Sequence, residues 1–234
     1  SIEAPPERRR GDALYHALRF DEYAGVLQAE GLVYGEELGD SLFDDGSDAG
    51  WLAEVREIYA PDRIRRLFRA EFQRQLQDAE MAEAVAFYQG KTGARSVTLE
   101  LSAREALLDP DIEAASVERM YTMKADGDPR IAMVEAFSDA NGLVENNVVS
   151  ALNGNFAFLD ALTDAGQGPF VRDRGAMMSA IWEQEPEIRE ETEEWVLSFF
   201  NFAYTPLTDD EMAEVIAFSN SVQGRRLNTA LFAA

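Results

Sequence analysis

The chain has 234 residues, of which 46% are apolar, and its 21 Lys and Arg face 44 Asp and Glu, a formal net charge of −23. A chain of this length and composition buries a sizeable core in one large or two small domains. Its charge would repel nucleic acids and anionic lipid surfaces, so we expect neither class of partner.

The sequence contains no cysteine, which removes disulfides, a thiolate nucleophile and Cys-ligated zinc from the possible chemistry. The absence also fits an oxidising compartment. No apolar run approaches the roughly 20 residues that a membrane span needs, and no signal peptide is visible. We therefore predict a soluble protein without a membrane span.

In chain order, residues 1–12 are rich in Pro, Arg and Glu and predict a flexible N-terminal lead-in. Apolar residues at steps of three and four begin at Ala13 and predict helix to about residue 43. Three glycines weaken the second part of this stretch, so that one bent helix or two short helices both fit: Gly31, Gly35 and Gly39. The polar run at 44–50 then breaks the pattern.

Helical periodicity returns at Trp51, and Pro61 stands where a new helix can begin. Further helical stretches are predicted at 79–90, 95–108, 111–124, 130–150, 152–163 and 182–204. The Gly- and Pro-containing run 166–175 predicts a long loop. The whole pattern predicts an all-α fold.

Two segments of the chain resemble each other. Residues 51–103 and residues 182–234 align without a gap and share 15 identities in 53 positions, where ordinary residue usage gives about four. The identities include Phe87 with Phe218 and Arg95 with Arg226, and apolar or chain-reversing positions dominate them. Such positions are what a duplicated fold retains.

The residues expected to start and end helices are also similar in the two segments. Thr208 precedes Glu211 by three residues and predicts a capping box, in which the two residues satisfy amide groups at a helix start. The first segment has Gln77 in the place of Thr208, so we expect that helix to be less well capped, or capped by Asp78. Gly93 and Gly224 are predicted to end their helices in left-handed conformations.

These observations predict a duplicated helical bundle. We place repeat 1 at residues 13–124 and repeat 2 at residues 130–234, packed about a pseudo-twofold axis. The sequence leaves open whether the two repeats share one core, and it does not fix the oligomeric state.

The repeated segment resembles a known bacterial family. LQDAEMAEAVAFYQGKTGARS and TPLTDDEMAEVIAFSNSVQGRRLN are similar to the motif of the exported-protein family known as domain of unknown function 2059. The resemblance implies an all-helical fold and a periplasmic or otherwise exported location. It implies no catalytic residues, and the chain departs from the family by carrying the unit twice.

Four carboxylates are the candidates for a metal site. Glu80 with Glu83, and Glu211 with Glu214, are each spaced by three residues and therefore share a helix face. No Glu-x-x-His motif accompanies them, and in so acidic a chain close spacings arise freely, so capping and solvated-face roles are favoured.

Other chemical motifs are weaker still. His16 is the sole histidine, and we expect it to have a structural role because no partner for it can be placed. The acidic run from Asp44 fails as an EF-hand, which would need Gly where Ala49 stands and Glu where Val55 stands. The aromatic stretch 195–204 is expected to pack in the core, with a hydrophobic ligand groove as the alternative.

The sequence thus favours a non-enzymatic binding or interaction protein of the bacterial cell envelope. Its expected partner is another protein or a small hydrophobic ligand, and no catalytic residue or cofactor is assigned. The alternative is a carboxylate-based or metal-dependent hydrolase that uses the four glutamates above.

Overall fold

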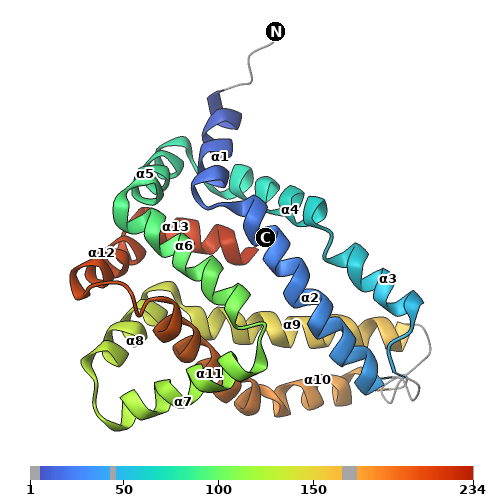
Figure 1. The fold of residues 1–234 in the computed structure, drawn as a ribbon. Helices are drawn as coiled ribbons and strands as arrows, with labels where there is room; N and C mark the ends of the chain where they lie inside the picture. The colour runs from blue at the N-terminus through green and yellow to red at the C-terminus, as the bar shows by residue number, and fades with distance from the viewer. Residues whose placement is uncertain (1–5, 43–45, 165–172, 234) are drawn as a thin grey trace. The chain divides into compact units, whose positions relative to one another are not determined.

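The computed structural model describes residues 6–42, 46–164 and 173–233, and within these ranges the fold is entirely helical, with no strand (Figure 1). The predicted all-α class is confirmed. The thirteen described helices are α1 (Pro6–Ala17), α2 (Phe20–Leu42), α3 (Ala49–Ile58), α4 (Pro61–Gln75), α5 (Asp78–Gln89), α6 (Lys91–Ala106), α7 (Pro110–Ala125), α8 (Pro129–Asn141), α9 (Leu143–Asp164), α10 (Arg174–Glu183), α11 (Glu185–Ala203), α12 (Asp209–Asn220) and α13 (Val222–Ala233). None of these helices is both long and apolar enough to cross a bilayer.

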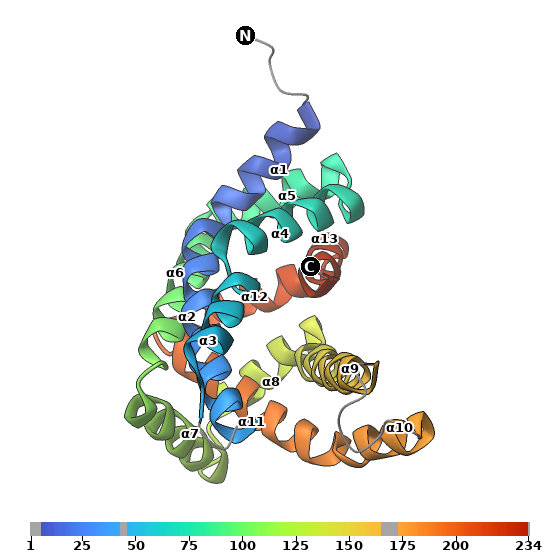
Figure 2. The same cartoon turned by 90° about the vertical axis from the view of Figure 1, so that its right-hand side faces the viewer.

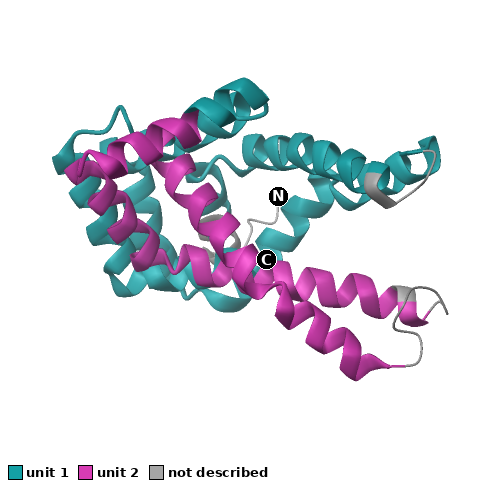
Figure 3. Ribbon diagram, turned by 90° about the horizontal axis from the view of Figure 1, so that it is seen from below, with its two compact units in different colours: residues 1–115, 203–234 teal, residues 116–202 magenta. Residues whose placement is uncertain are grey.

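The chain divides into two compact units (Figure 3). Unit 1 joins residues 1–115 to residues 203–234, and unit 2 consists of residues 116–202. The C-terminal helices α12 and α13 therefore belong to the unit built by the N-terminal half. The predicted repeats 13–124 and 130–234 were defined by sequence similarity, whereas the two units are defined by compactness. The division into repeats therefore stays a prediction.

The main core of unit 1 combines residues of α1, α2, α4 and α5 with residues of α13, which is distant from them in sequence. Leu14 and Tyr15 of α1 have no exposed surface, and they pack with Phe72 of α4, Met81 of α5 and Leu227 of α13. Figure 2 shows α13 beside α4 and α5. The C-terminal helix thus completes a core that begins with the first helix.

The N-terminal lead-in predicted for residues 1–12 is wrong for its second half. Helix α1 begins at Pro6, ahead of the predicted start at Ala13, while residues 1–5 lie outside the described residues. Proline is compatible with a helix's first turn because its missing amide hydrogen has no partner there anyway.

Helix α2 is one continuous helix, and its glycines admit a neighbour. A Cβ atom on Gly35 would lie 2.4 Å from a methyl group of Val55, and one on Gly31 would lie 2.4 Å from the ring of Tyr59. Trp51 of α3 also contacts α2 here, because its indole Nε1 donates a 2.6 Å hydrogen bond to the Gly35 carbonyl. The glycines therefore let α3 approach α2 closely and do not bend the helix.

In unit 2 the predicted helix 130–150 is wrong, because it breaks at Gly142 into α8 and α9. Gly142 has φ +55°, and its amide donates to the carbonyls of Ser138 and Asp139, which ends α8. Helices α9 and α10 then pack together through Val148, Leu152, Met177 and Ile181. Of the loop predicted at 166–175, residues 166–172 lie outside the described residues.

The helical corners α5–α6 and α12–α13 have matching bounds. Adding 131 to the bounds of α5 gives those of α12, and adding 131 to the start of α6 gives the start of α13. The predicted left-handed stops at Gly93 and Gly224 are wrong, because both glycines lie inside the second helix of their corner. A Cβ atom there would meet the carbonyl oxygen of Phe87 at 2.1 Å or that of Phe218 at 2.0 Å.

Gly224→Ala should destabilise the protein by about 1–3 kcal/mol or more, because a backbone carbonyl cannot move aside without shifting the whole corner. Gly154→Ala in α9 is the matched control, since a Cβ there meets nothing within 4 Å, and it should stabilise by about 0.5–1 kcal/mol. Chemical denaturation measures both. Equal effects of the two substitutions would contradict the close approach.

Candidate functional site

The two matching corners meet through equivalent residues. The rings of Phe87 on α5 and Phe218 on α12 stack in parallel, with centroids 4.1 Å apart and an interplanar angle of 2°. These two residues are themselves related by the 131-residue offset. A residue that contacts its own counterpart lies where a twofold axis would pass.

Two ion pairs join the same corners in a reciprocal manner. Arg95 Nη1 donates to both carboxylate oxygens of Glu211 at 3.0 Å. Glu80 Oε1 lies 3.5 Å from Nε of Arg226. Each arginine is the counterpart of the other, and so is each glutamate. We call these four residues and the phenylalanine pair the corner interface.

The same two glutamates begin their helices. Glu211 Oε2 accepts from the Thr208 amide at 2.9 Å, while Thr208 Oγ1 accepts from the Glu211 amide at 3.2 Å, which confirms the predicted capping box. In α5, Glu80 accepts from the Gln77 amide at 2.9 Å. Each carboxylate thus serves a helix start and a cation of the other corner at once.

These contacts lower the pKa of Glu211 below its ordinary value of 4.5. The amide of Thr208 is the main cause, and Arg95 adds to it, because both favour the ionised carboxylate. The negative charge of Glu211 is therefore tied to the folded state.

No three of the four candidate metal ligands come together in an arrangement that could hold an ion. Glu80 and Glu211 face arginines, whereas Glu83 and Glu214 are exposed. Glu211 and Glu214 line a groove of about 370 Å³ together with Lys91. In the described part of the chain, no group of three or more His, Asp or Glu side chains is arranged to bind a metal.

His16 is exposed, whereas most of the aromatic stretch 195–204 is buried. His16 is exposed in the last turn of α1, with its ring edge-on to Tyr15 at 6.1 Å. Phe199 and Tyr204 are each 1% exposed, as expected for core residues, while Trp195 keeps 38% of its surface exposed.

A polar cluster in unit 1 escaped the sequence analysis. The Tyr204 hydroxyl donates to the carboxylate of Glu100 on α6. One turn further along α6, Arg104 pairs with Glu30 of α2 at 3.1 Å and lies over the ring of Tyr23, 5.3 Å from its centroid. Polar residues scattered at helical spacing give no sequence signal for such a cluster, because their partners come from other helices.

Burial controls the ionisation of this cluster. Desolvation raises the pKa of Glu100, and the Tyr204 hydrogen bond and Arg104 oppose that rise without cancelling it. Desolvation also raises the pKa of the Tyr204 hydroxyl well above 10, and the neighbouring Glu100 adds to that shift. Because the groups satisfy one another, a structural role explains the cluster.

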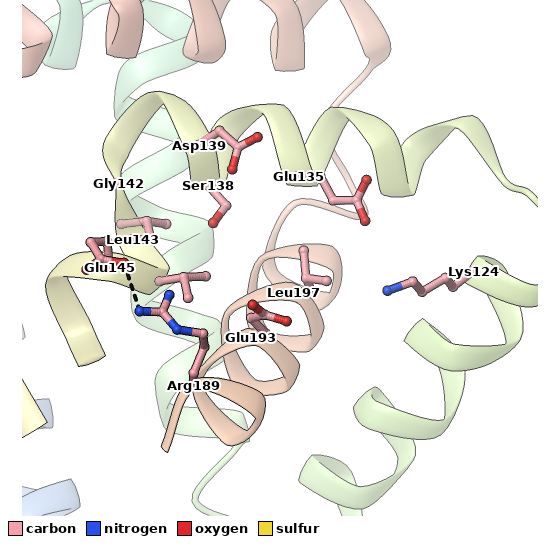
Figure 4. Close-up of a pocket in the computed structure, with 11 residues that line it drawn as sticks. Lys124, Glu135, Ser138, Asp139, Gly142, Leu143, Glu145, Arg189, Glu193 and Leu197 are labelled. Atoms are coloured by element: carbon pink, nitrogen blue, oxygen red, sulfur yellow. Dashed lines mark hydrogen bonds and ion pairs between the residues drawn. The ribbon is translucent and has the colours of Figure 1, made fainter. Parts of the chain in front are cut away.

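Unit 2 contains an open pocket of about 490 Å³ (Figure 4). It lies at the junction of α8 and α9 and reaches α7 and α11. The residues that line it are Lys124, Glu135, Ser138, Asp139, Gly142, Leu143, Val144, Glu145, Arg189, Glu193 and Leu197. Its volume falls in the range of small-molecule sites.

Most charges of this pocket are not neutralised within the protein. Arg189 is paired, with Glu185 at 2.6 Å and Glu145 at 3.0 Å. Among the described residues, Glu135, Asp139 and Glu193 have no cation within ion-pair distance, and the ammonium group of Lys124 has no carboxylate there.

Ser138 is the most buried polar side chain among the pocket's lining residues. It is only 4% exposed, and its hydroxyl points into the pocket in Figure 4. No described residue forms a hydrogen bond with this hydroxyl. The hydroxyl faces the open pocket without a partner in the protein, so it is available to a ligand. The pocket was not predicted from the sequence, because its lining comes from four helices and follows no motif.

One comparison with known proteins gives a match. Residues 62–120 match the family described as "Uncharacterized protein conserved in bacteria (DUF2059)". This is the family whose motif the repeated segment resembles, but the match covers only the first of the two similar segments. No curated protein and no solved structure matches the chain.

Glu211→Gln should lower stability at neutral pH and cost progressively less as the pH falls. Gln preserves the capping acceptor, so the loss reports the charge. A lowered folded-state pKa stabilises the fold above the usual carboxyl pKa, and that contribution disappears as the pH falls through the lowered value. Urea denaturation at several pH values measures it. Glu214→Gln, one turn away and exposed, is the control, and equal pH dependence in both variants would contradict the assignment.

Glu100→Gln should show the opposite dependence on pH. A raised folded-state pKa means that ionisation of Glu100 weakens the fold as the pH rises from the ordinary carboxyl value through the raised one. The variant therefore gains stability relative to the parent protein as the pH rises, while its amide oxygen still accepts from Tyr204. A stability difference that is constant between about pH 4 and pH 8 would refute this reading.

Proposed function

We propose that the protein is a non-enzymatic binding or interaction protein of the bacterial cell envelope. The observation that carries the proposal is the pocket of unit 2, where a buried hydroxyl and several unneutralised charges line a volume suited to a ligand. The family match supports a bacterial protein, and the absence of cysteine fits an oxidising compartment such as the envelope.

The position of the carboxylates named for the hydrolase alternative supports binding over hydrolysis. Glu80 and Glu211 already hold helix starts and arginines, so their role in the fold accounts for them. The polar lining of the pocket also favours a charged ligand or partner over the small hydrophobic ligand considered from the sequence.

We also propose that residues 51–103 and 182–234 arose by duplication, and that the corners α5–α6 and α12–α13, which both belong to unit 1, pack about a local pseudo-twofold axis. Three features support this: the matching helix bounds, the stack of Phe87 on its counterpart Phe218, and the reciprocal ion pairs. In this view α12–α13 covers α5–α6 as a second subunit would in a homodimer.

Native mass spectrometry of the protein purified from its own host tests the binding function. We expect a fraction of the protein to retain a non-covalent ligand, and we expect Glu80→Gln and Glu211→Gln to leave that fraction unchanged. Divalent cations should shift the melting temperature of the parent protein and of these two variants equally. A bare protein that shows hydrolysis dependent on a divalent cation, abolished in the two variants, would overturn the proposal in favour of a metal-dependent hydrolase.

A further inference from the structure

We propose that the pocket of unit 2 binds an organic cation with more than one protonated amine, such as a polyamine or closely spaced lysine side chains of a peptide. The inference rests on the proposed binding function and names the ligand chemistry of that same pocket. Its evidence is the charge of the lining, the unpartnered Ser138 hydroxyl and the spread of the acceptors.

The charge of the pocket favours a cation. Its lining carries four carboxylates, Glu135, Asp139, Glu145 and Glu193, and two cations, Lys124 and Arg189, which leaves a balance of −2. The pair of Arg189 and Glu145 accounts for one charge of each sign. Three carboxylates and one ammonium group of the lining are therefore left without an ion-pair partner among the described residues.

The surroundings reinforce this preference. Residues 116–202 contain 16 Asp and Glu and 6 Lys and Arg, a balance of −10. A field of this sign raises the local concentration of cations and speeds their association. An anionic ligand would have to overcome it.

Ser138 supplies the specific acceptor. Its hydroxyl has no hydrogen-bond partner among the described residues, so its oxygen can accept from an ammonium N–H in place of water. Figure 4 shows the Ser138 hydroxyl pointing into the pocket, with Glu193 of α11 and Asp139 of α8 also at its wall. An ammonium group within the pocket can therefore combine a neutral acceptor with a charged one.

The arrangement of the acceptors separates amines from metal ions. A metal ion needs several oxygen ligands converging on one point, and no described residues form such a group. Here the carboxylates are distributed over α8 and α11 around about 490 Å³. An extended chain with N–H donors at more than one position fits this distribution, because each ammonium group can reach a different carboxylate.

Removal of Lys124 tests whether the ligand carries a positive or a negative charge. The Lys124 ammonium group carries the same charge as the proposed ligand and has no carboxylate within ion-pair distance. Removing it should therefore tighten binding of a polyamine, whereas it would weaken binding of any anion.

Calorimetric titration of the whole protein with spermidine at low salt tests the inference. Glu193→Gln should weaken binding by about tenfold, as expected for the loss of one charge-assisted hydrogen bond. Ser138→Ala should weaken it several-fold, and Lys124→Ala should strengthen it. The matched control is Glu190→Gln, which changes the same charge on an exposed residue of α11 outside the pocket and should leave the affinity within about twofold.

Two further ligands complete the test. Tetramethylammonium, which has no N–H donor, should bind far more weakly than spermidine, and a short dilysine peptide identifies the source of the amines if it binds more tightly than spermidine. Equal weakening by Glu190→Gln and Glu193→Gln, or equal binding of tetramethylammonium, would overturn the proposal. A host ligand retained in native mass spectrometry without spermidine or peptide binding would refute the amine chemistry alone, whereas no ligand in either experiment would refute the binding function too.

Discussion

The contact of the two helical corners is the constraint on which unit 1 depends. α12 and α13 lie at the end of the chain, yet Leu227 of α13 helps to fill the core with residues of α1, α4 and α5. The stack of Phe87 on Phe218 and the reciprocal ion pairs hold that distant segment in place. If this contact were lost, the core would lose one of its walls.

The corner interface also explains how Glu80 and Glu211, two of the metal-site candidates, serve the fold. A carboxylate at the third position of a helix accepts from the free amides of the helix start, and an arginine of the other corner pairs with the same carboxylate. The charges of these carboxylates are thereby balanced by amides and arginines within unit 1. The pocket of unit 2 differs, because its carboxylates and the Ser138 hydroxyl have acceptor capacity left for a ligand.

The sequence predicted what depends on local periodicity and missed what depends on partners. Helical class and the Thr208 capping box are local features and were predicted correctly. Gly93 and Gly224 were expected to be helix ends. They are glycines for another reason, because the carbonyl oxygens of Phe87 and Phe218 leave no room for a Cβ atom at these positions. The break at Gly142 and the early start of α1 at Pro6 were also missed, as was the pocket around Ser138. Each of these depends on competing local signals or on residues of several helices, which a single helix's periodicity does not encode.

A double-mutant cycle on Phe87→Leu and Phe218→Leu tests the central claim most directly. Both rings are partly buried, and leucine keeps them apolar while removing the stack. The account predicts a coupling free energy of about 0.5–1.5 kcal/mol between the two substitutions in chemical denaturation. Substitutions that add within about 0.3 kcal/mol would mean that the two corners do not meet through these rings, and would contradict the account.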